Sequence, residues 1–131
     1  MSRRRSHAAQ ALVEFALVLP LLTALSLGVV QLMLYAHARD VVASSVQEAA
    51  RLSAEDGRGL EEGYARARAL ITAGVGSSLE PLQIDGRMEA EVVSVRIDTA
   101  LRPILPLPAV AGLPIHAEAW VARERFRPGG G

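Results

Sequence analysis

The sequence predicts a membrane-anchored α+β protein with one long N-terminal helix, a second helix and a small antiparallel β-sheet. Three observations support this prediction. Residues 15–34 contain no charged side chain. Apolar residues then recur with helical spacing as far as residue 75, and after residue 90 they recur at every second position, as in a half-buried strand. Roughly seventy-five residues remain beyond the long helix, enough for one small module that would gain stability from a partner.

The run from Phe15 to Leu34 would span ~30 Å as a helix, which is the thickness of the hydrocarbon core of a bilayer. Two alternatives compete with a membrane helix. A cleaved secretory signal has a shorter apolar run of ~7–15 residues and a small-residue cleavage site, for which Ala36-His37-Ala38 is a weak candidate. A buried helix of a soluble protein would need more chain than these 131 residues to cover twenty apolar positions on all sides.

Charge predicts the orientation of this helix. Arg3, Arg4 and Arg5 precede it, and the first thirteen residues contain no acid, so the N-terminus is expected in the cytoplasm and the rest outside. The formal net charge of zero divides into +3 for residues 1–13 and −3 for residues 14–131, because 11 of the 14 arginines and all 14 acids lie in the second range. An external part with this balance has no basic surface for nucleic acid.

The pattern divides the chain into five segments. They are a basic leader (1–9), a transmembrane helix (10–35), its external amphipathic continuation (36–56), a small α+β extracytoplasmic module (57–126) and a disordered tail (127–131). Phe15 to Glu55 is expected to form one helical rod of ~60 Å, ended by Asp56-Gly57-Arg58-Gly59. Pro20 lacks an N–H group and is expected to kink this rod.

The external elements follow from periodicity. One narrow stripe of the rod joins Tyr35, Val42, Val46, Ala49 and Ser53. A second helix is predicted from Leu60 to Val75, where Leu60, Tyr64, Ala67, Ile71 and Val75 share a face. Strands are predicted at Glu91–Leu101 and Ile115–Arg123, and Leu82–Ile84 is a candidate hairpin partner with Asp85-Gly86 as the turn.

Arg102 to Pro114 contains four prolines and no acid, which predicts an apolar loop between the last two strands. Two interpretations remain open. The loop either covers the sheet as a lid or presents an exposed patch to a partner subunit or the bilayer surface.

No residue pattern in the chain predicts an enzyme, a metal site or a cofactor. His7, His37 and His116 lack metal-ligand spacing, there is no Cys, and neither GxSxG, GxGxxG nor a P-loop occurs. Absence of Cys also excludes disulfides.

Glu14 is expected to interact with a partner group. A carboxylate at the start of a membrane helix costs free energy there, and a partner lowers this cost. It could simply reach the headgroup interface and titrate in water. If the leader were removed after Ala9, the new amine of Gln10 would lie one helical turn away, or could face Glu14 of an adjacent chain.

The segment from Ala9 to Pro20, AQALVEFALVLP, with the basic leader before it and residues 35–54 behind it, resembles the TadE-like family of tight-adherence (Flp-type) pilus systems. The resemblance implies a bacterial pilin-like protein, or pseudopilin, of the inner membrane that takes part in pilus assembly, secretion or adhesion. It also implies a prepilin peptidase that cuts between Ala9 and Gln10, with Glu14 as the acid of the family and Phe15 as the aromatic that follows it. The residue before the cut is most often Gly in the family, and here it is Ala9.

Two functions are therefore predicted. The first is a processed pseudopilin that joins other pilin-like subunits and the assembly machinery at the membrane. The second is an uncleaved single-span protein whose external module binds a ligand or partner in the cell envelope.

Overall fold

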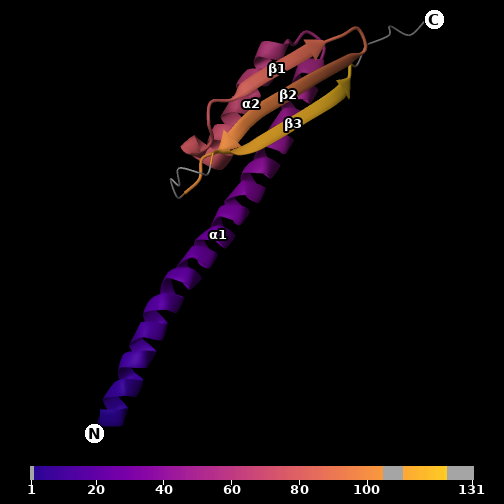
Figure 1. Cartoon of the computed structure of the whole chain (residues 1–131). Helices are drawn as coiled ribbons and strands as arrows, with labels where there is room; N and C mark the ends of the chain where they lie inside the picture. Colours follow the sequence, from indigo (N-terminus) through magenta and orange to yellow (C-terminus); the bar gives the residue numbers. More distant parts are fainter. Residues whose placement is uncertain (1, 105–110, 124–131) are drawn as a thin grey trace, which may run out of the picture. The chain divides into compact units, whose positions relative to one another are not determined.

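The computed structural model describes residues 2–104 and 111–123, except for the side chains of residues 2–4. Its elements are α1 (Ser2–Ala54), α2 (Leu60–Val75), a 3₁₀ turn η1 (Gly76–Ser78), β1 (Gln83–Met88), β2 (Val92–Leu101) and β3 (Leu113–Ala122) (Figure 1). A long N-terminal helix, a second helix and a three-stranded antiparallel sheet confirm the predicted fold class. Residues 105–110 of the predicted Arg102–Pro114 loop and the expected disordered tail (127–131) lie outside the described residues.

The chain divides into two compact units, residues 1–34 and residues 35–131. The first unit consists of the N-terminal part of α1. The second contains the rest of α1, α2 and the sheet.

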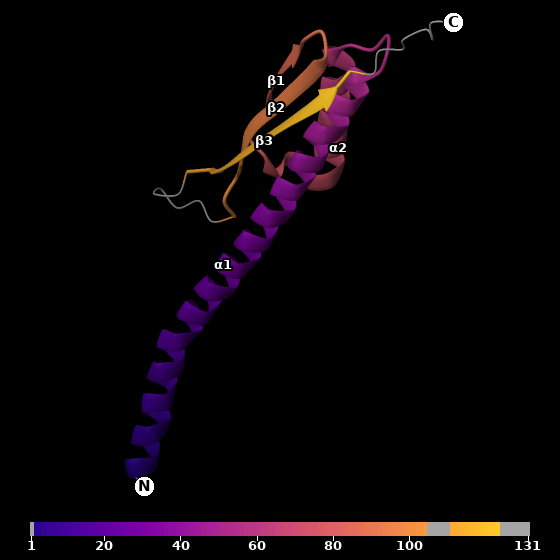
Figure 2. The same cartoon turned by 90° about the vertical axis from the view of Figure 1, so that its right-hand side faces the viewer.

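Two layers form the second unit. The sheet has the order β1-β2-β3 with both pairs antiparallel, and α2 and the end of α1 lie on the same face of it (Figures 1 and 2). No helix of the described residues lies on the opposite face of the sheet (Figure 1).

Alternation along the strands builds the core between these layers. Val93, Val95 and Ile97 of β2 are fully buried and face the helices, and Ile115 of β3 joins them. Small residues of α1 complete the core on the helical side. They include Ala38, Val42, Val46, Ala49 and Ser53, so the predicted stripe is the buried face of this helix.

Two glycines end the helices. Gly57, with φ 80°, follows the last turn of α1, and Gly76, with φ 67°, caps α2 by donating its N–H to the carbonyl of Thr72. Positive φ is nearly free only for glycine, which explains why both helices end where the sequence predicts.

The first helix starts earlier than expected. The predicted rod begins at Phe15, whereas α1 begins at Ser2 and includes the basic leader. Arginine and alanine are good helix formers and no proline precedes Pro20, so nothing in the leader interrupts the helix.

The predicted hairpin turn at Asp85-Gly86 is wrong. Both residues lie inside β1, opposite Arg96 and Val95, and the turn is made by Ala90 and Glu91, with the Glu89 N–H bonded to the Val92 carbonyl at 2.9 Å. Gly86 serves close packing, because a Cβ there would lie 2.6 Å from the Tyr64 hydroxyl and 2.9 Å from Leu60 Cδ2.

The predicted loop is also too long at its C-terminal end. Leu113 and Pro114 belong to β3 and pair with Leu101 and Ala100. Since β3 is an edge strand, the missing N–H of a proline near its start removes no bond from the interior of the sheet.

Candidate functional site

The residues predicted to mark leader processing lie together on α1. Ala9, Gln10, Glu14 and Phe15 are all exposed on this helix. Gln10 and Glu14 are four residues apart and therefore share a face one turn apart. The structure thus places the residues on one continuous helix, and cleavage itself stays a prediction.

Glu14 stands at the boundary between the leader and the apolar part of α1. Its side chain makes no hydrogen bond or ion pair with any residue that the structure describes. An ionised carboxylate only accepts hydrogen bonds, so this side chain is available to an amine or another donor. No other acid occurs before Asp40.

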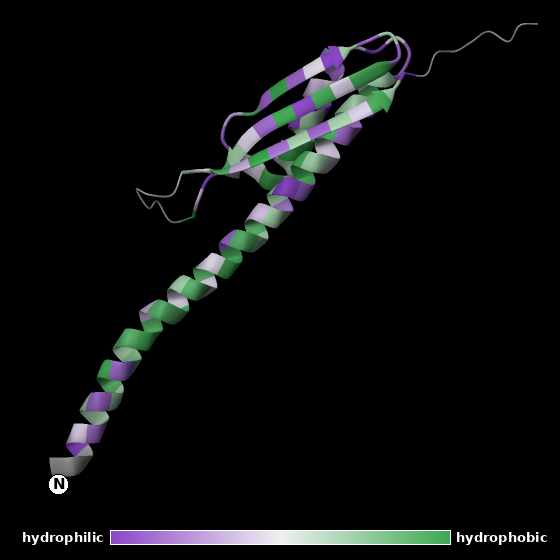
Figure 3. Ribbon diagram, turned by 45° about the vertical axis from the view of Figure 1, so that its right-hand side comes forward, coloured by the Kyte–Doolittle hydropathy of each residue, from purple (hydrophilic) through white to green (hydrophobic). Residues whose placement is uncertain are grey.

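The apolar part of α1 is mostly hydrophobic in Figure 3, and nearly all of its side chains are exposed in the described structure. It is long and apolar enough to cross a membrane, and none of the most apolar window is buried. Leu17, Leu21 and Leu25, for example, are 73%, 70% and 65% exposed. A surface of this extent needs lipid or other apolar helices to cover it.

Polar side chains within the apolar part bond to the helix itself. Thr23 Oγ1 donates to the Leu19 carbonyl at 2.9 Å, and Ser26 Oγ donates to the Leu22 carbonyl at 2.8 Å. Because each hydroxyl donates to a carbonyl of its own helix, neither donor is left without an acceptor in lipid. The helix continues through Pro20, and the kink expected there stays a prediction.

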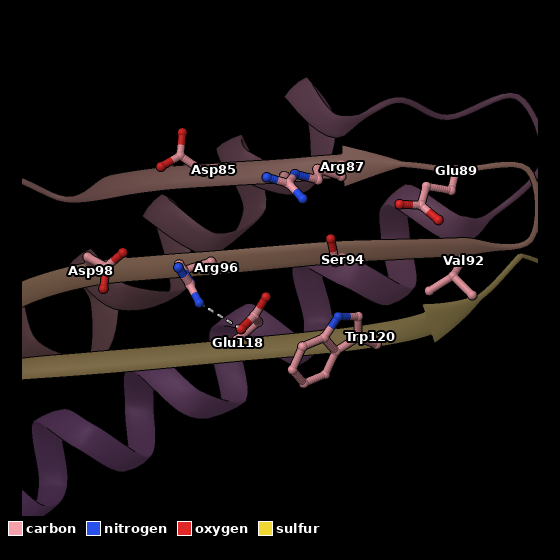
Figure 4. A pocket seen from close by; sticks show the side chains of 10 residues that line it. Asp85, Arg87, Glu89, Val92, Ser94, Arg96, Asp98, Glu118 and Trp120 are labelled. Atoms are coloured by element: carbon pink, nitrogen blue, oxygen red, sulfur yellow. Dashed lines mark hydrogen bonds and ion pairs between the residues drawn. The ribbon is translucent and has the colours of Figure 1, made fainter.

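The second unit offers a different surface, the uncovered face of the sheet (Figure 4). Side chains stand on it in rows across the three strands, since opposite residues share a face: Arg87, Ser94 and Trp120 form one row, and Asp85, Arg96 and Glu118 the next. A shallow hollow of about 640 Å³ lies over these rows. We call the six residues the polar face.

Two ion pairs cross between β2 and β3 on this side of the sheet. Arg96 pairs with Glu118 at 3.1 Å, and His116 Nδ1 pairs with Asp98 Oδ1. Trp120 is 65% exposed. Sequence reasoning missed Trp120, although the alternation of Ile115–Arg123 places it on the same side as His116 and Glu118.

Two side chains near the beginning of the second unit bind the backbone of the module. Tyr35 Oη donates to the Pro114 carbonyl at 2.9 Å, and His37 Nε2 lies 3.1 Å from the Gly74 carbonyl near the end of α2. Since a carbonyl only accepts, this His37 nitrogen is the protonated one. These contacts tie α1 to β3 and α2, roles that the sequence does not reveal.

Tyr64 is the ionisable residue whose environment changes its titration. Partial burial is the main reason that its pKa is raised above 10.0, and the charges of Asp85 and Glu61 raise the pKa further. Its hydroxyl lies close to Gly86 of β1.

Within the described ranges, no group of three or more His, Cys, Asp or Glu residues could hold a metal ion. The pair of His116 and Asp98 supplies two ligands, fewer than structural or catalytic zinc sites use.

These features define a membrane-anchored protein with a long apolar N-terminal helix and a small α+β module. Residues 9–51 match the family model of TadE-like protein, which confirms the resemblance over this segment, about a third of the chain. The match supports a component associated with tight-adherence pili. No curated protein and no solved structure gave a significant match.

Proposed function

We propose that this chain is a pseudopilin of a tight-adherence (Flp-type) pilus or secretion assembly, non-enzymatic, and processed by a prepilin peptidase between Ala9 and Gln10. The observation that carries the proposal is the unpartnered carboxylate of Glu14. This carboxylate has no partner in the described structure and stands at the start of an exposed apolar helix, within the segment that matches the family.

An apolar helix separates from the bilayer only if other apolar helices cover it. Removal of residues 1–9 takes away Arg3, Arg4 and Arg5 and creates an amine at Gln10. That amine neutralises Glu14 of the same or an adjacent chain, which lowers the cost of burying the carboxylate among packed helices.

Before processing, the three arginines hold the N-terminus in the cytoplasm and the C-terminus outside the inner membrane. The partners in this proposal are the prepilin peptidase, other pilin-like subunits and the assembly machinery. The module after residue 57 remains outside the membrane during each step.

The first test is the intact mass and N-terminal sequence of the protein from native membranes and from sheared surface material. A chain starting at Gln10 that disappears when the peptidase is deleted supports the proposal. Ala9→Gly should be processed at least as completely, and Ala9→Arg should block the cut. A full-length chain in every fraction would overturn processing.

The second test is Glu14→Ala, which should disturb assembly and leave membrane insertion intact. Thr23→Ala is the matched control on the same helix, because the Thr23 hydroxyl bonds only to the Leu19 carbonyl. Unchanged piliation and adhesion in the Glu14 variant would contradict the role of this carboxylate.

A second candidate function is an uncleaved single-span protein whose module binds a ligand or partner in the envelope. The uncovered sheet face with its exposed Trp120 favours it. The Arg102–Pro114 loop is its other candidate surface, of which residues 105–110 lie outside the described structure. If polar substitutions in that loop change neither complex formation nor folding, the loop has no part in binding.

A further inference from the structure

The polar face combines an exposed aromatic ring with a hollow lined by hydrogen-bonding groups. Trp120 stands at the end of a row that continues through Ser94 to Arg87, two strand spacings or ~10 Å away. The side chains of Trp120 and Arg87 make no hydrogen bond or ion pair with any described residue. An indole and a guanidinium are thus both available at the two ends of one row (Figure 4).

An exposed Trp120 is unusual for this module. Val92, 37% exposed, is its diagonal neighbour on β2, and together they form a small apolar corner. Large aromatic side chains left in water usually mark a binding surface, since burying one is worth more than burying most other side chains.

This corner lies at the far end of the sheet from the start of the second unit. Tyr35, the first residue of that unit, bonds to Pro114 at the opposite end of β3. Trp120 lies six positions after Pro114, which corresponds to ~20 Å along a strand. A ligand at Trp120 therefore does not compete with the Tyr35 contact.

The charges of the face select the chemistry of the ligand. Two arginines, Arg87 and Arg96, and four acids line the hollow, the acids being Asp85, Glu89, Asp98 and Glu118. Arg96 pairs with Glu118 and Asp98 with His116, whereas Arg87, Asp85 and Glu89 make no ion pair with any described residue. A charged ligand of either sign would meet like charges, whereas a neutral ligand rich in hydroxyl groups can donate to the carboxylates and accept from the arginines.

A protein partner fits this face less well. The central part of a protein interface is depleted in charged residues, and here the centre is the Arg96–Glu118 pair with the aromatic residue at one end. Sugar rings have apolar C–H faces that stack on an indole and hydroxyl edges that bond to polar side chains.

We propose that the polar face binds a neutral saccharide chain, with one ring stacked on Trp120 and the following units lying along Ser94 toward Arg87. The row is longer than a single ring, so the ligand has at least two sugar units. This inference is independent of leader processing and would survive the failure of the proposed pseudopilin function.

The test uses the full chain in phosphocholine detergent micelles, which present neither a sugar nor an aromatic group. Cellotetraose, chitotetraose and mannotetraose are titrated while tryptophan emission is recorded. Trp120 is the only tryptophan of the chain, so the signal reports this site alone. Saturable movement of the emission to shorter wavelength with at least one of the three is expected.

Variants then locate the site by calorimetry. Trp120→Ala should bind at least about tenfold more weakly, Trp120→Phe should keep part of the affinity, and Arg68→Ala on the exposed side of α2 should bind as the parent does. Because Trp120 is 65% exposed, its truncation should leave the circular dichroism spectrum unchanged.

Three outcomes would overturn the proposal. In the first, none of the three saccharides shifts the tryptophan emission saturably. In the second, Trp120→Ala and Trp120→Phe bind the saccharides as well as the parent chain does. In the third, Trp120 is required to capture another subunit while no saccharide binds, which would make this face a protein interface.

Discussion

Gly63 of α2 lies directly against Ser53 of α1, with no room for a side chain between them. A Cβ at residue 63 would overlap Ser53 Oγ and lie 2.7 Å from the carbonyl oxygen of Ala49. The second obstacle is backbone and cannot rotate away. The close approach of the two helices therefore depends on the absence of a side chain at residue 63.

Gly63→Ala should destabilise the second unit by roughly 2 kcal/mol, although alanine is the better helix former, because overlap with the Ala49 carbonyl forces the helices apart. Gly59→Ala is the control, since no atom lies within 4 Å of the position its Cβ would take. Urea unfolding of the full chain in micelles, followed by Trp120 emission, measures both. Equal midpoints for Gly63→Ala and the parent would show that the helices are not tightly packed here.

Ser53→Ala should be neutral or stabilising by up to ~1 kcal/mol. The Ser53 side chain is fully buried and its hydroxyl has no hydrogen-bond partner in the described structure, so its removal relieves a desolvation cost. Ser45→Ala is the matched control, because Ser45 Oγ donates to the Val41 carbonyl at 2.7 Å. A Ser53 variant less stable than the Ser45 variant would indicate a water or partner at this hydroxyl.

The Ser53 substitution should not rescue Gly63→Ala. The Ala49 carbonyl remains in place when the Ser53 hydroxyl is gone, so the double variant should stay destabilised by most of the single effect. Full recovery in a double-mutant cycle would contradict the backbone overlap.

The helices of this protein are readable from sequence because their signals are local. The spacing from Leu60 to Val75 and the glycines beside each end predict α2 within a residue, and the stripe through Val42 and Val46 predicts the buried side of α1. The predicted strands are likewise found, with ends shifted by one or two residues.

What the sequence could not show depends on contacts between distant residues. Asp85-Gly86 is a sequence typical of a turn. In the structure Gly86 instead pairs with Val95 inside a strand and packs against Tyr64, a contact between residues that are far apart in the sequence. The hydrogen-bond partners of Tyr35 and His37 are 79 and 37 residues away in the sequence, so no local pattern predicts them. Glu14 could be named because it is a carboxylate at the start of the apolar run, and Gln10 because the resemblance to the TadE-like family implies a cut before it.

Tyr35→Phe should loosen the beginning of β3 and cost about 1 kcal/mol, because the bond to the Pro114 carbonyl is lost while the ring still packs. Hydrogen exchange measures this locally, and amides of Leu113 and Ile115 should exchange several times faster. Amides near the other end of β3, such as Trp120, provide the internal control. Unchanged exchange at Leu113 and Ile115 would show that the hydroxyl does not hold the strand.

The raised pKa of Tyr64 predicts that the folded chain loses stability in alkaline solution. Burial, with the charges of Asp85 and Glu61, raises the pKa of the folded-state hydroxyl above 10.0, the ordinary value expected when the chain is unfolded. Below that pH the residue is neutral in both states and contributes no pH dependence. Above it the unfolded chain releases the proton more readily, so stability falls as pH rises from about 10 through the folded pKa.

The chain isolates this effect unusually well, because it has no lysine or cysteine and only two tyrosines. Tyr64→Phe should reduce the fall in unfolding midpoint between about pH 9 and 11, and Asp85→Asn should reduce it by less, since burial is the larger cause of the raised pKa. Urea midpoints across this range, with tyrosinate absorbance recorded in parallel, test both variants. If the parent and Tyr64→Phe lose stability equally, the hydroxyl is as well solvated in the folded chain as in the unfolded one.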